Sequence, residues 1–330
     1  MPVNLTPSNT DPRPFKVAAV QAEPAWLDLD AGIAKIVNII HEAGRRGARL
    51  VGFPELFIPG YPWTMMCNSF VDCQDILLRY AANALAVHSP QMERVCAAAR
   101  EAGVWVVLGF AERAGAGMFM SQVIISSDGA IANHRRKVKV THYEKTIFSD
   151  GEGNTIHNVV QTPFGRLGAL NCWEHLQPAL KIHFYAQTPQ LFVGGWPPAF
   201  TPGINGAPFS VSAPCFSACS RAVAMEGGCI GVVCSQVVSE RSAEVMRIAE
   251  FPWFEGAIPG GGFAAVYGPD GALLGSAKEA GVEEIVVVEV ALDMVGKAKM
   301  MYDVMGTDSR HDLMHLVANG SGYNVVEYEK

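Results

Sequence analysis

Cys172 is the residue of this chain best placed to act as a nucleophile. It closes the apolar run RLGALN (166–171), and a helix-like segment containing Glu174 follows it. A thiol at the end of a strand, in front of a helix N-terminus, gains thiolate character from the exposed amides and the helix dipole. The alternative is a buried structural cysteine, which is the interpretation we give to the other seven cysteines.

A carboxylate in an aromatic setting is the second candidate for chemistry. Glu55 follows the apolar run ARLVGF (48–53), and three prolines lie nearby together with Phe57, Tyr61 and Trp63. Ligands bind at strand ends in α/β sheets, and a charge inside an aromatic wall is costly unless it has a partner or a function. The alternative is a solvated carboxylate at the start of a loop.

The basic segment HRRKVKVTHYEKTIFSDGEG (134–153) supplies the third candidate. Alternation along a strand puts Lys137 and Lys139 on the same face. Alternation alone therefore leaves open which lysine enters a site. The alternative is a solvated basic hairpin followed by a loop.

Buried strands must position these segments, and further apolar runs predict them at 16–21, 105–110, 190–195 and 229–235. Helical stretches alternate with them. Asp28 is expected to cap one helix, and Ser89-Pro90 to begin another. This alternation is typical of α/β layers, and Asp-Gly turns add antiparallel pairs, so we expect a mixed sheet.

The end of the chain predicts a late hairpin and a tail. GGFAAVY (261–267) and EIVVVEV (284–290) resemble its two strands, with a turn at 268–271. Because no linker divides the chain, we expect a loose leader over 1–15, one domain over 16–295 and a tail for subunit contacts over 296–330.

Composition excludes several classes of protein. Of the 330 residues, 49% are apolar and only 17% are charged, so the chain can bury a large core and is not disordered. The net charge of −7 argues against nucleic-acid binding. With no secretory signal and no apolar stretch of about 18 residues, we expect a cytoplasmic protein with reduced cysteines and no membrane contact. His311 and His315 lack a third ligand, so no metal site is predicted.

Together and in this order, the three motifs resemble the nitrilase superfamily of carbon–nitrogen hydrolases. The resemblance runs from Lys16 to about Val290, and LNCWEHLQP is close to the cysteine signature of the true nitrilase branch. It implies a four-layer α-β-β-α sandwich with mixed sheets. It also implies a homo-oligomer, either a dimer or a larger spiral assembly.

The resemblance also implies roles for individual residues. Glu55 matches the general base and acid, Cys172 the nucleophile, and Lys137 the catalytic lysine, with Lys139 the weaker match. Glu144 matches a second glutamate that the family places against the lysine and the substrate. Substrate-side positions are implied for Tyr61, His142, Trp173 and Trp196.

The activity implied is hydrolysis of an organic nitrile to a carboxylic acid and ammonia, through a thioimidate and then a thioester on the cysteine. The partners are the nitrile and water, and no cofactor is needed. Alternatives within the family are a cyanide-hydrolysing relative, which makes formamide or formate, and an amidase or carbamoylase. The segment WEHLQP favours the nitrile branch over amidases. An assembly scaffold without activity is the alternative from another class.

Overall fold

The apolar runs form a mixed β-sheet in the computed structural model, which describes residues 13–321. The parallel pairs include β1 with β2 and β7 with β8, whereas β3, β4 and β5 are antiparallel neighbours. The predicted α/β fold with a mixed sheet is confirmed. The strands are β1 (Phe15–Ala22), β2 (Ala48–Gly52), β3 (Trp105–Ala114), β4 (Gly117–Ile125), β5 (Ile131–Arg136), β6 (Val159–Thr162), β7 (Gly165–Asn171), β8 (Leu191–Trp196), β9 (Ile230–Gln236), β10 (Ala265–Tyr267), β11 (Leu273–Ser276) and β12 (Glu284–Val290).

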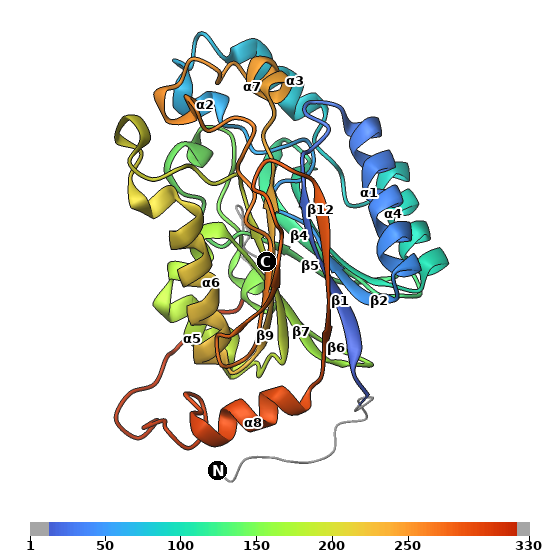
Figure 1. Cartoon of the computed structure of the whole chain (residues 1–330), viewed down its shortest axis with the longest axis vertical. Coiled ribbons are helices and arrows are strands. Elements are labelled where there is room, and N and C mark those ends of the chain that lie inside the picture. Colours follow the sequence, from blue (N-terminus) through green and yellow to red (C-terminus); the bar gives the residue numbers. More distant parts are fainter. Residues whose placement is uncertain (1–12, 322–330) are drawn as a thin grey trace, which may run out of the picture.

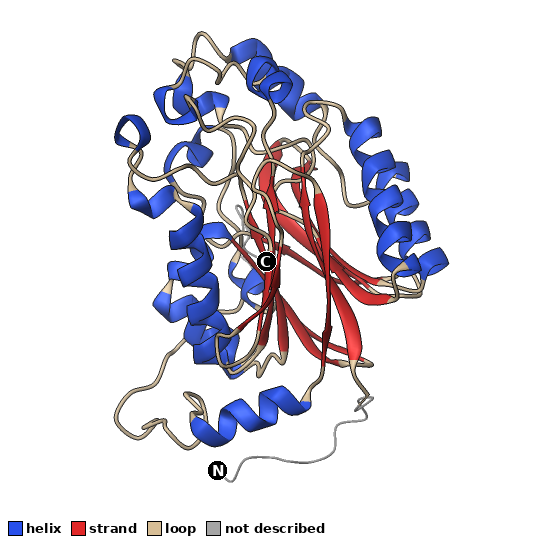
Figure 2. Ribbon diagram, in the orientation of Figure 1, coloured by secondary structure: helices blue, strands red, loops and turns tan. Residues whose placement is uncertain are grey.

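The sheet has two halves that lie against each other. One half runs β5-β4-β3-β2-β1-β12 and the other β6-β7-β8-β9-β10-β11. The halves are hydrogen-bonded where Gln21 and Ala22 of β1 pair with Ser235 and Gln236 of β9. Elsewhere they meet through side chains, and Figure 2 shows the strands in the middle of the molecule with helices on both sides.

The helices begin where the sequence predicts. Asp28 accepts a hydrogen bond from the Ala31 amide at the start of α1, and Ser89 accepts one from Met92 at the start of α4. Figure 1 shows α1 and α4 together on one side of the sheet, and α5 and α6 on the other. The helices are α1 (Leu29–Arg45), α2 (Thr64–Cys67), α3 (Gln74–Ala82), α4 (Pro90–Ala102), α5 (Pro178–Ala186), α6 (Ala213–Gly227), α7 (Glu240–Val245) and α8 (Asp293–Met301).

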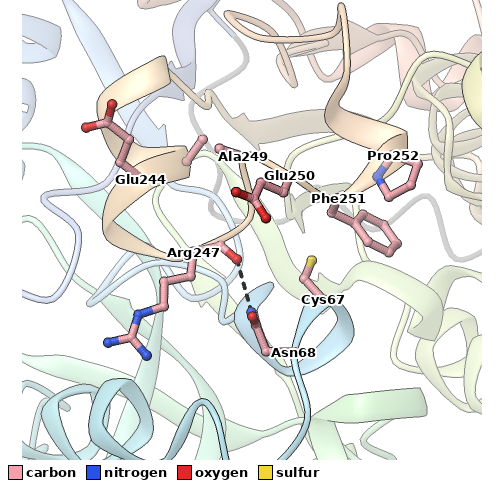
Figure 3. Close-up of a pocket in the computed structure, with 9 residues that line it drawn as sticks. Cys67, Asn68, Glu244, Arg247, Ala249, Glu250, Phe251 and Pro252 are labelled. Carbon is pink, nitrogen blue, oxygen red and sulfur yellow. Dashed lines mark hydrogen bonds between the residues drawn. The ribbon is translucent and has the colours of Figure 1, made fainter.

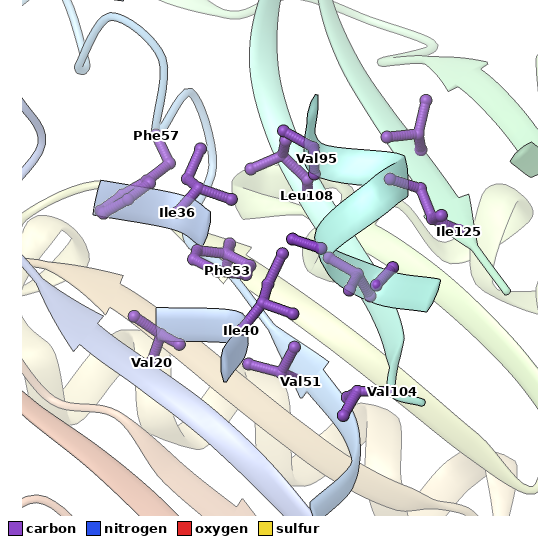
Figure 4. Close-up of a cluster of buried hydrophobic side chains, with 14 of the residues drawn as sticks. Val20, Ile36, Ile40, Val51, Phe53, Phe57, Val95, Val104, Leu108 and Ile125 are labelled. Carbon is purple, nitrogen blue, oxygen red and sulfur yellow. The ribbon is translucent and has the colours of Figure 1, made fainter. Parts of the chain in front are cut away.

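Three apolar clusters follow this arrangement. The first lies between α1, α4 and the first half of the sheet, and Figure 4 shows Ile36, Val51 and Leu108 within it. The second fills the space between the two halves, where Leu50 and Val193 are fully buried. A third lies under α5 and α6. Layers of this kind bury both faces of each half-sheet and leave the strand ends free for a site.

The late hairpin differs from the sequence prediction. The turn at 268–271 joins β10 to β11, because β11 follows the turn directly and pairs with Ala265–Tyr267. β12 instead lies antiparallel to β1 over Phe15–Gln21. There Val286 and Val290 join the apolar cluster between the two halves, and this burial fixes the partner of the strand.

The first described strand and the last described helix each extend across a predicted domain limit, at residues 15 and 295. The expected leader over 1–15 lies outside the described residues as far as residue 12, and β1 begins at Phe15. The helix α8 crosses the predicted boundary at residue 295. Within residues 13–321, no helix combines the length and apolarity needed to cross a membrane.

Candidate active site

Lys137 lies at the centre of a buried cluster of charges, just after the end of β5. Its Nζ donates to Glu55 Oε1 at 3.0 Å, and to the two carboxylate oxygens of Glu144 at 2.9 and 3.0 Å. Glu55 follows β2, and Glu144 belongs to a 3₁₀ helix over His142–Thr146. All three side chains are exposed by 1% or less. The structure therefore brings together three of the four residues that the sequence predicted for catalysis.

The charges of this cluster depend on one another. Burial raises the pKa of Glu55 against the opposing effect of Lys137, to about 8. Burial also disfavours the charged lysine, but the carboxylates of Glu144 and Glu55 outweigh it and raise the pKa of Lys137. The other oxygen of Glu55, Oε2, is buried without a hydrogen-bond partner among the described residues. Glu55 thus has a free oxygen and a pKa suited to proton transfer near neutral pH.

Cys172 completes the predicted set from the other half of the sheet. It follows β7 as the first residue of a 3₁₀ helix over Cys172–Leu176, with a positive φ of 44°. Burial and the charge of Glu55 raise the pKa of its thiol, and the opposing charge of Lys137 does not compensate. The predicted thiolate character is therefore wrong for the resting site, because burial outweighs the amides of one short helix. This thiol needs a base.

The backbone at Glu55 lies close to strands from both halves of the sheet. A Cβ on Gly109 of β3 would lie 2.5 Å from the Pro54 carbonyl oxygen, and one on Gly195 of β8 would lie 2.8 Å from the Glu55 nitrogen. Gln236, at the end of β9, donates from Nε2 to the Glu55 carbonyl at 2.5 Å. Sequence reasoning missed these residues, because no local pattern shows that three distant strands meet at one peptide.

Substituting Gly195 with alanine is therefore expected to displace Glu55. We expect kcat to fall about 10²-fold, since a shift of about 1 Å in a reacting group costs that much, and the free energy of unfolding to fall by about 1–3 kcal/mol. Gly296→Ala is the matched control, because a Cβ there meets nothing within 4 Å. Unchanged kinetics in Gly195→Ala would show that the placement of Glu55 is not limiting.

The four predicted substrate-side residues lie in different surroundings. The Tyr61 hydroxyl donates to Glu144 Oε1 at 2.8 Å, so this side chain contacts the charge cluster. The rings of His142 and Trp173 are 5.7 Å apart. Trp196 is fully buried, stacks on Phe216 of α6 and donates to a serine hydroxyl, as a core residue would. A role of any of them in substrate binding stays a prediction.

Lys139 lies apart from Lys137, contrary to the shared face that alternation predicted. Its side chain is about half exposed and pairs with Asp150. The reason is that β5 ends at Arg136, so period-two alternation does not extend over residues 137–140. Of the two lysines, only Lys137 contacts Glu55 and Glu144 among the described contacts.

A separate cavity of about 580 Å³ lies near α2 and α7. Figure 3 shows Cys67 and Phe251 on its wall, and Asn68 donating to the Arg247 carbonyl. None of the predicted site residues lines it. In the part of the chain that the structure describes, no cluster of three or more histidine, cysteine or acidic side chains could hold a metal ion.

The chain is similar in sequence to known proteins over most of its length. A sequence model of the carbon-nitrogen hydrolase family matches residues 16–300. The chain is similar to a cyanide hydratase from Armillaria gallica, with 54% identity over 329 residues, covering 99% of this chain and 92% of that protein. It is also similar to a nitrilase from Penicillium rubens, with 41% identity over 313 residues and coverages of 93% and 94%.

Among solved structures, the chain is similar in fold to a carbon-nitrogen hydrolase from Helicobacter pylori. The TM-score is 0.68 at 19% identity, and the match covers 92% of this chain and 99% of that one. The family match spans all three motifs and most of the chain. This protein therefore belongs to the carbon-nitrogen hydrolase family, in its nitrilase branch, and is an enzyme that acts on carbon–nitrogen bonds.

Proposed function

We propose that this enzyme hydrates hydrogen cyanide to formamide, with Cys172 as nucleophile, Glu55 as base and acid, and Lys137 as the stabilising cation. The observation that carries the proposal is the buried cluster in which the Lys137 ammonium contacts both carboxylates within 3.0 Å. Similarity to the cyanide hydratase of Armillaria gallica favours cyanide as the substrate.

In the first step, Glu55 takes the proton of the Cys172 thiol through its free oxygen Oε2. The thiolate adds to the nitrile carbon, one C≡N π bond breaks, and its electron pair moves to nitrogen. The ammonium group of Lys137 stabilises this developing negative charge. Glu55 then returns the proton to nitrogen, and a thioimidate on Cys172 results.

In the second step, Glu55 removes a proton from water as the water adds to the thioimidate carbon. Glu55 passes this proton to the imine nitrogen, so the tetrahedral carbon then carries sulfur, a hydroxyl and an amino group. Glu55, ionised again, next takes the hydroxyl proton as the C=O bond forms. If the proton on Glu55 goes to sulfur, the thiol leaves and formamide is released. If it goes to nitrogen, ammonia leaves, and a second water must free formate from the thioester. The product thus reports where Glu55 delivers its proton.

The tight burial of the site favours a small substrate. The side chains of Glu55, Lys137, Glu144 and Cys172 are exposed by 1% or less. Hydrogen cyanide has two heavy atoms, so it demands less rearrangement of these walls than any organic nitrile does.

A second candidate is hydrolysis of an organic nitrile to the carboxylic acid and ammonia. The aromatic rings beside the charge cluster favour it. The ring centroids of Tyr61 and Trp63 are 4.6 Å apart, and those of Trp63 and Phe200 are 4.8 Å apart. An arylalkyl group could pack against such rings if they moved apart. The similarity to the nitrilase of Penicillium rubens also supports this candidate.

Product analysis with cyanide, phenylacetonitrile and the two matching amides separates these functions. We expect formamide in amounts equal to the cyanide consumed, with little ammonia. Equal amounts of formate and ammonia from cyanide would contradict hydration. Acid and ammonia from phenylacetonitrile, with cyanide untouched, would favour the second candidate. Ammonia from the amides alone would contradict both.

A further inference from the structure

A buried ion pair lies next to the proposed nucleophile and outside the proposed catalytic set. Arg135 of β5 donates from Nη1 to Glu174 Oε2 at 2.8 Å and from Nη2 to Glu174 Oε1 at 2.5 Å. Both side chains are 1% exposed. Burying two charges costs so much desolvation that such a pair is weak evidence of a gain in stability. The other contacts of the pair indicate a different purpose.

The Glu174 carboxylate also accepts hydrogen bonds from two backbone amides. Oε1 accepts from the Val138 amide at 3.0 Å, and Oε2 accepts from the Asn171 amide at 2.8 Å. Val138 directly follows Lys137, and Asn171 directly precedes Cys172. One side chain therefore ties the peptide beside the proposed lysine to the peptide beside the proposed nucleophile. These peptides belong to different halves of the sheet.

Arg135 extends the same connection to a neighbouring strand. Its Nη1 also donates to Gln122 Oε1 of β4 at 2.8 Å, and Gln122 Nε2 donates to the Leu170 carbonyl of β7 at 3.3 Å. Strands β4 and β5 lie in one half of the sheet, and β7 lies in the other. The Arg135–Glu174 pair and the Gln122–Leu170 hydrogen bond thus both connect the two halves of the sheet.

The surroundings of Glu174 favour its charged form. Burial alone would raise the pKa of Glu174, but Arg135 and the amides of Asn171 and Val138 together lower it. The negative charge of Glu174 also contributes to the raised pKa of Glu55. Glu174 thus acts on the site both by geometry and by its field.

We propose that Glu174, held by Arg135, is a positioning residue that fixes the Cys172 thiol relative to the Lys137 ammonium and so controls the reactivity of the thiol. The inference rests on the proposed catalytic roles of these two residues.

Glu174→Gln tests it, because glutamine keeps the shape but loses the charge and one accepting oxygen. We expect kcat for cyanide to fall about 10²-fold, as for other misplaced catalytic groups. We also expect alkylation of Cys172 by iodoacetamide to slow about tenfold. The pH midpoint of alkylation should move to lower pH, since Glu55 loses a negative neighbour.

Glu112→Gln is the matched control. Glu112 is 3% exposed and forms an ion pair with Arg136, the next residue of β5, through two hydrogen bonds. The other described hydrogen bonds of its side chain go to Ser121 and His134, and none goes to the segment of Cys172. Both variants remove one buried carboxylate, so both should lower the melting temperature. The control should keep the kcat and alkylation profile of the wild type. If Glu174→Gln behaves like Glu112→Gln, the pair is only structural and the inference is overturned.

Arg135→Lys covers the case in which Glu174→Gln does not fold. Lysine keeps the positive charge but lacks the planar fork with which Arg135 donates two parallel hydrogen bonds to Glu174 and another to Gln122. We expect a smaller loss of alkylation rate, about threefold, at an unchanged pH midpoint, and a wild-type rate would refute the inference. Alkylation needs no nitrile. A failure of the proposed cyanide activity in the wild type is therefore distinguishable from a failure of the role of Glu174.

Discussion

Cys172→Ala is expected to lower turnover of cyanide by about 10⁴-fold or more, as loss of a covalent nucleophile does in other enzymes. Alanine leaves Glu55, Lys137 and Glu144 in contact but gives the substrate carbon nothing to bond. Because the thiol is neutral and buried, its removal leaves no unpaired charge. The variant should therefore fold, and kcat together with the melting temperature checks both points.

Cys234→Ala is the matched control for this substitution. Cys234 is another fully buried thiol, and it lies in the apolar cluster between the two halves of the sheet. We expect it to cost about 1 kcal/mol of stability through the small cavity that it leaves, with kcat retained. Turnover by Cys172→Ala within a hundredfold of the wild type would rule out the covalent route.

Glu55→Gln is expected to lower kcat about 10³-fold, within the range for loss of a general base. The wild-type alkylation rate of Cys172 should rise through about pH 8, because Glu55 accepts the thiol proton only when it is ionised. Glutamine cannot ionise, so this rise should vanish. A rise at pH 8 that persists in Glu55→Gln would assign the base to another group.

The same substitution has a signature in stability. The folded pKa of Glu55, about 8, lies above its ordinary value of 4.5. The folded protein therefore holds a proton that the unfolded chain has lost, and this contribution to stability fades as pH rises from 4.5 to about 8. Glu55→Gln lacks this loss. The melting temperature of Glu55→Gln should therefore rise relative to that of the wild type as the pH increases from 4.5 to about 8.

Local signals allowed much of the fold to be predicted. Asp28 and Ser89 cap their helices through bonds to residues three positions on, so sequence alone contains both partners. Apolar runs mark the strands for the same reason, since burial on both faces leaves a continuous pattern. The prediction of the late hairpin was wrong because β12 pairs with β1, and burial against residues far away in the sequence determines this pairing.

The site was predictable as a set of residues but not as an electrostatic system. Glu55, Lys137, Glu144 and Cys172 follow from motifs. The protonated thiol does not, because burial outweighs the local amides and only the folded structure shows the burial. Glu174 and Gln236 act through hydrogen bonds to backbone atoms of distant segments, and such bonds leave no periodic trace in the sequence.

Because β1 pairs with β12, the first described strand gains one of its neighbours only after the last described strand has been synthesised. A chain interrupted before residue 284 leaves the edge of β1 along Phe15–Gln21 without its partner. Open strand edges invite aggregation, which folded proteins avoid by covering them. An incomplete translation product can contain every residue of the proposed catalytic set and still carry this exposed edge. We therefore expect chains that end before β12 to aggregate more readily than chains that contain it.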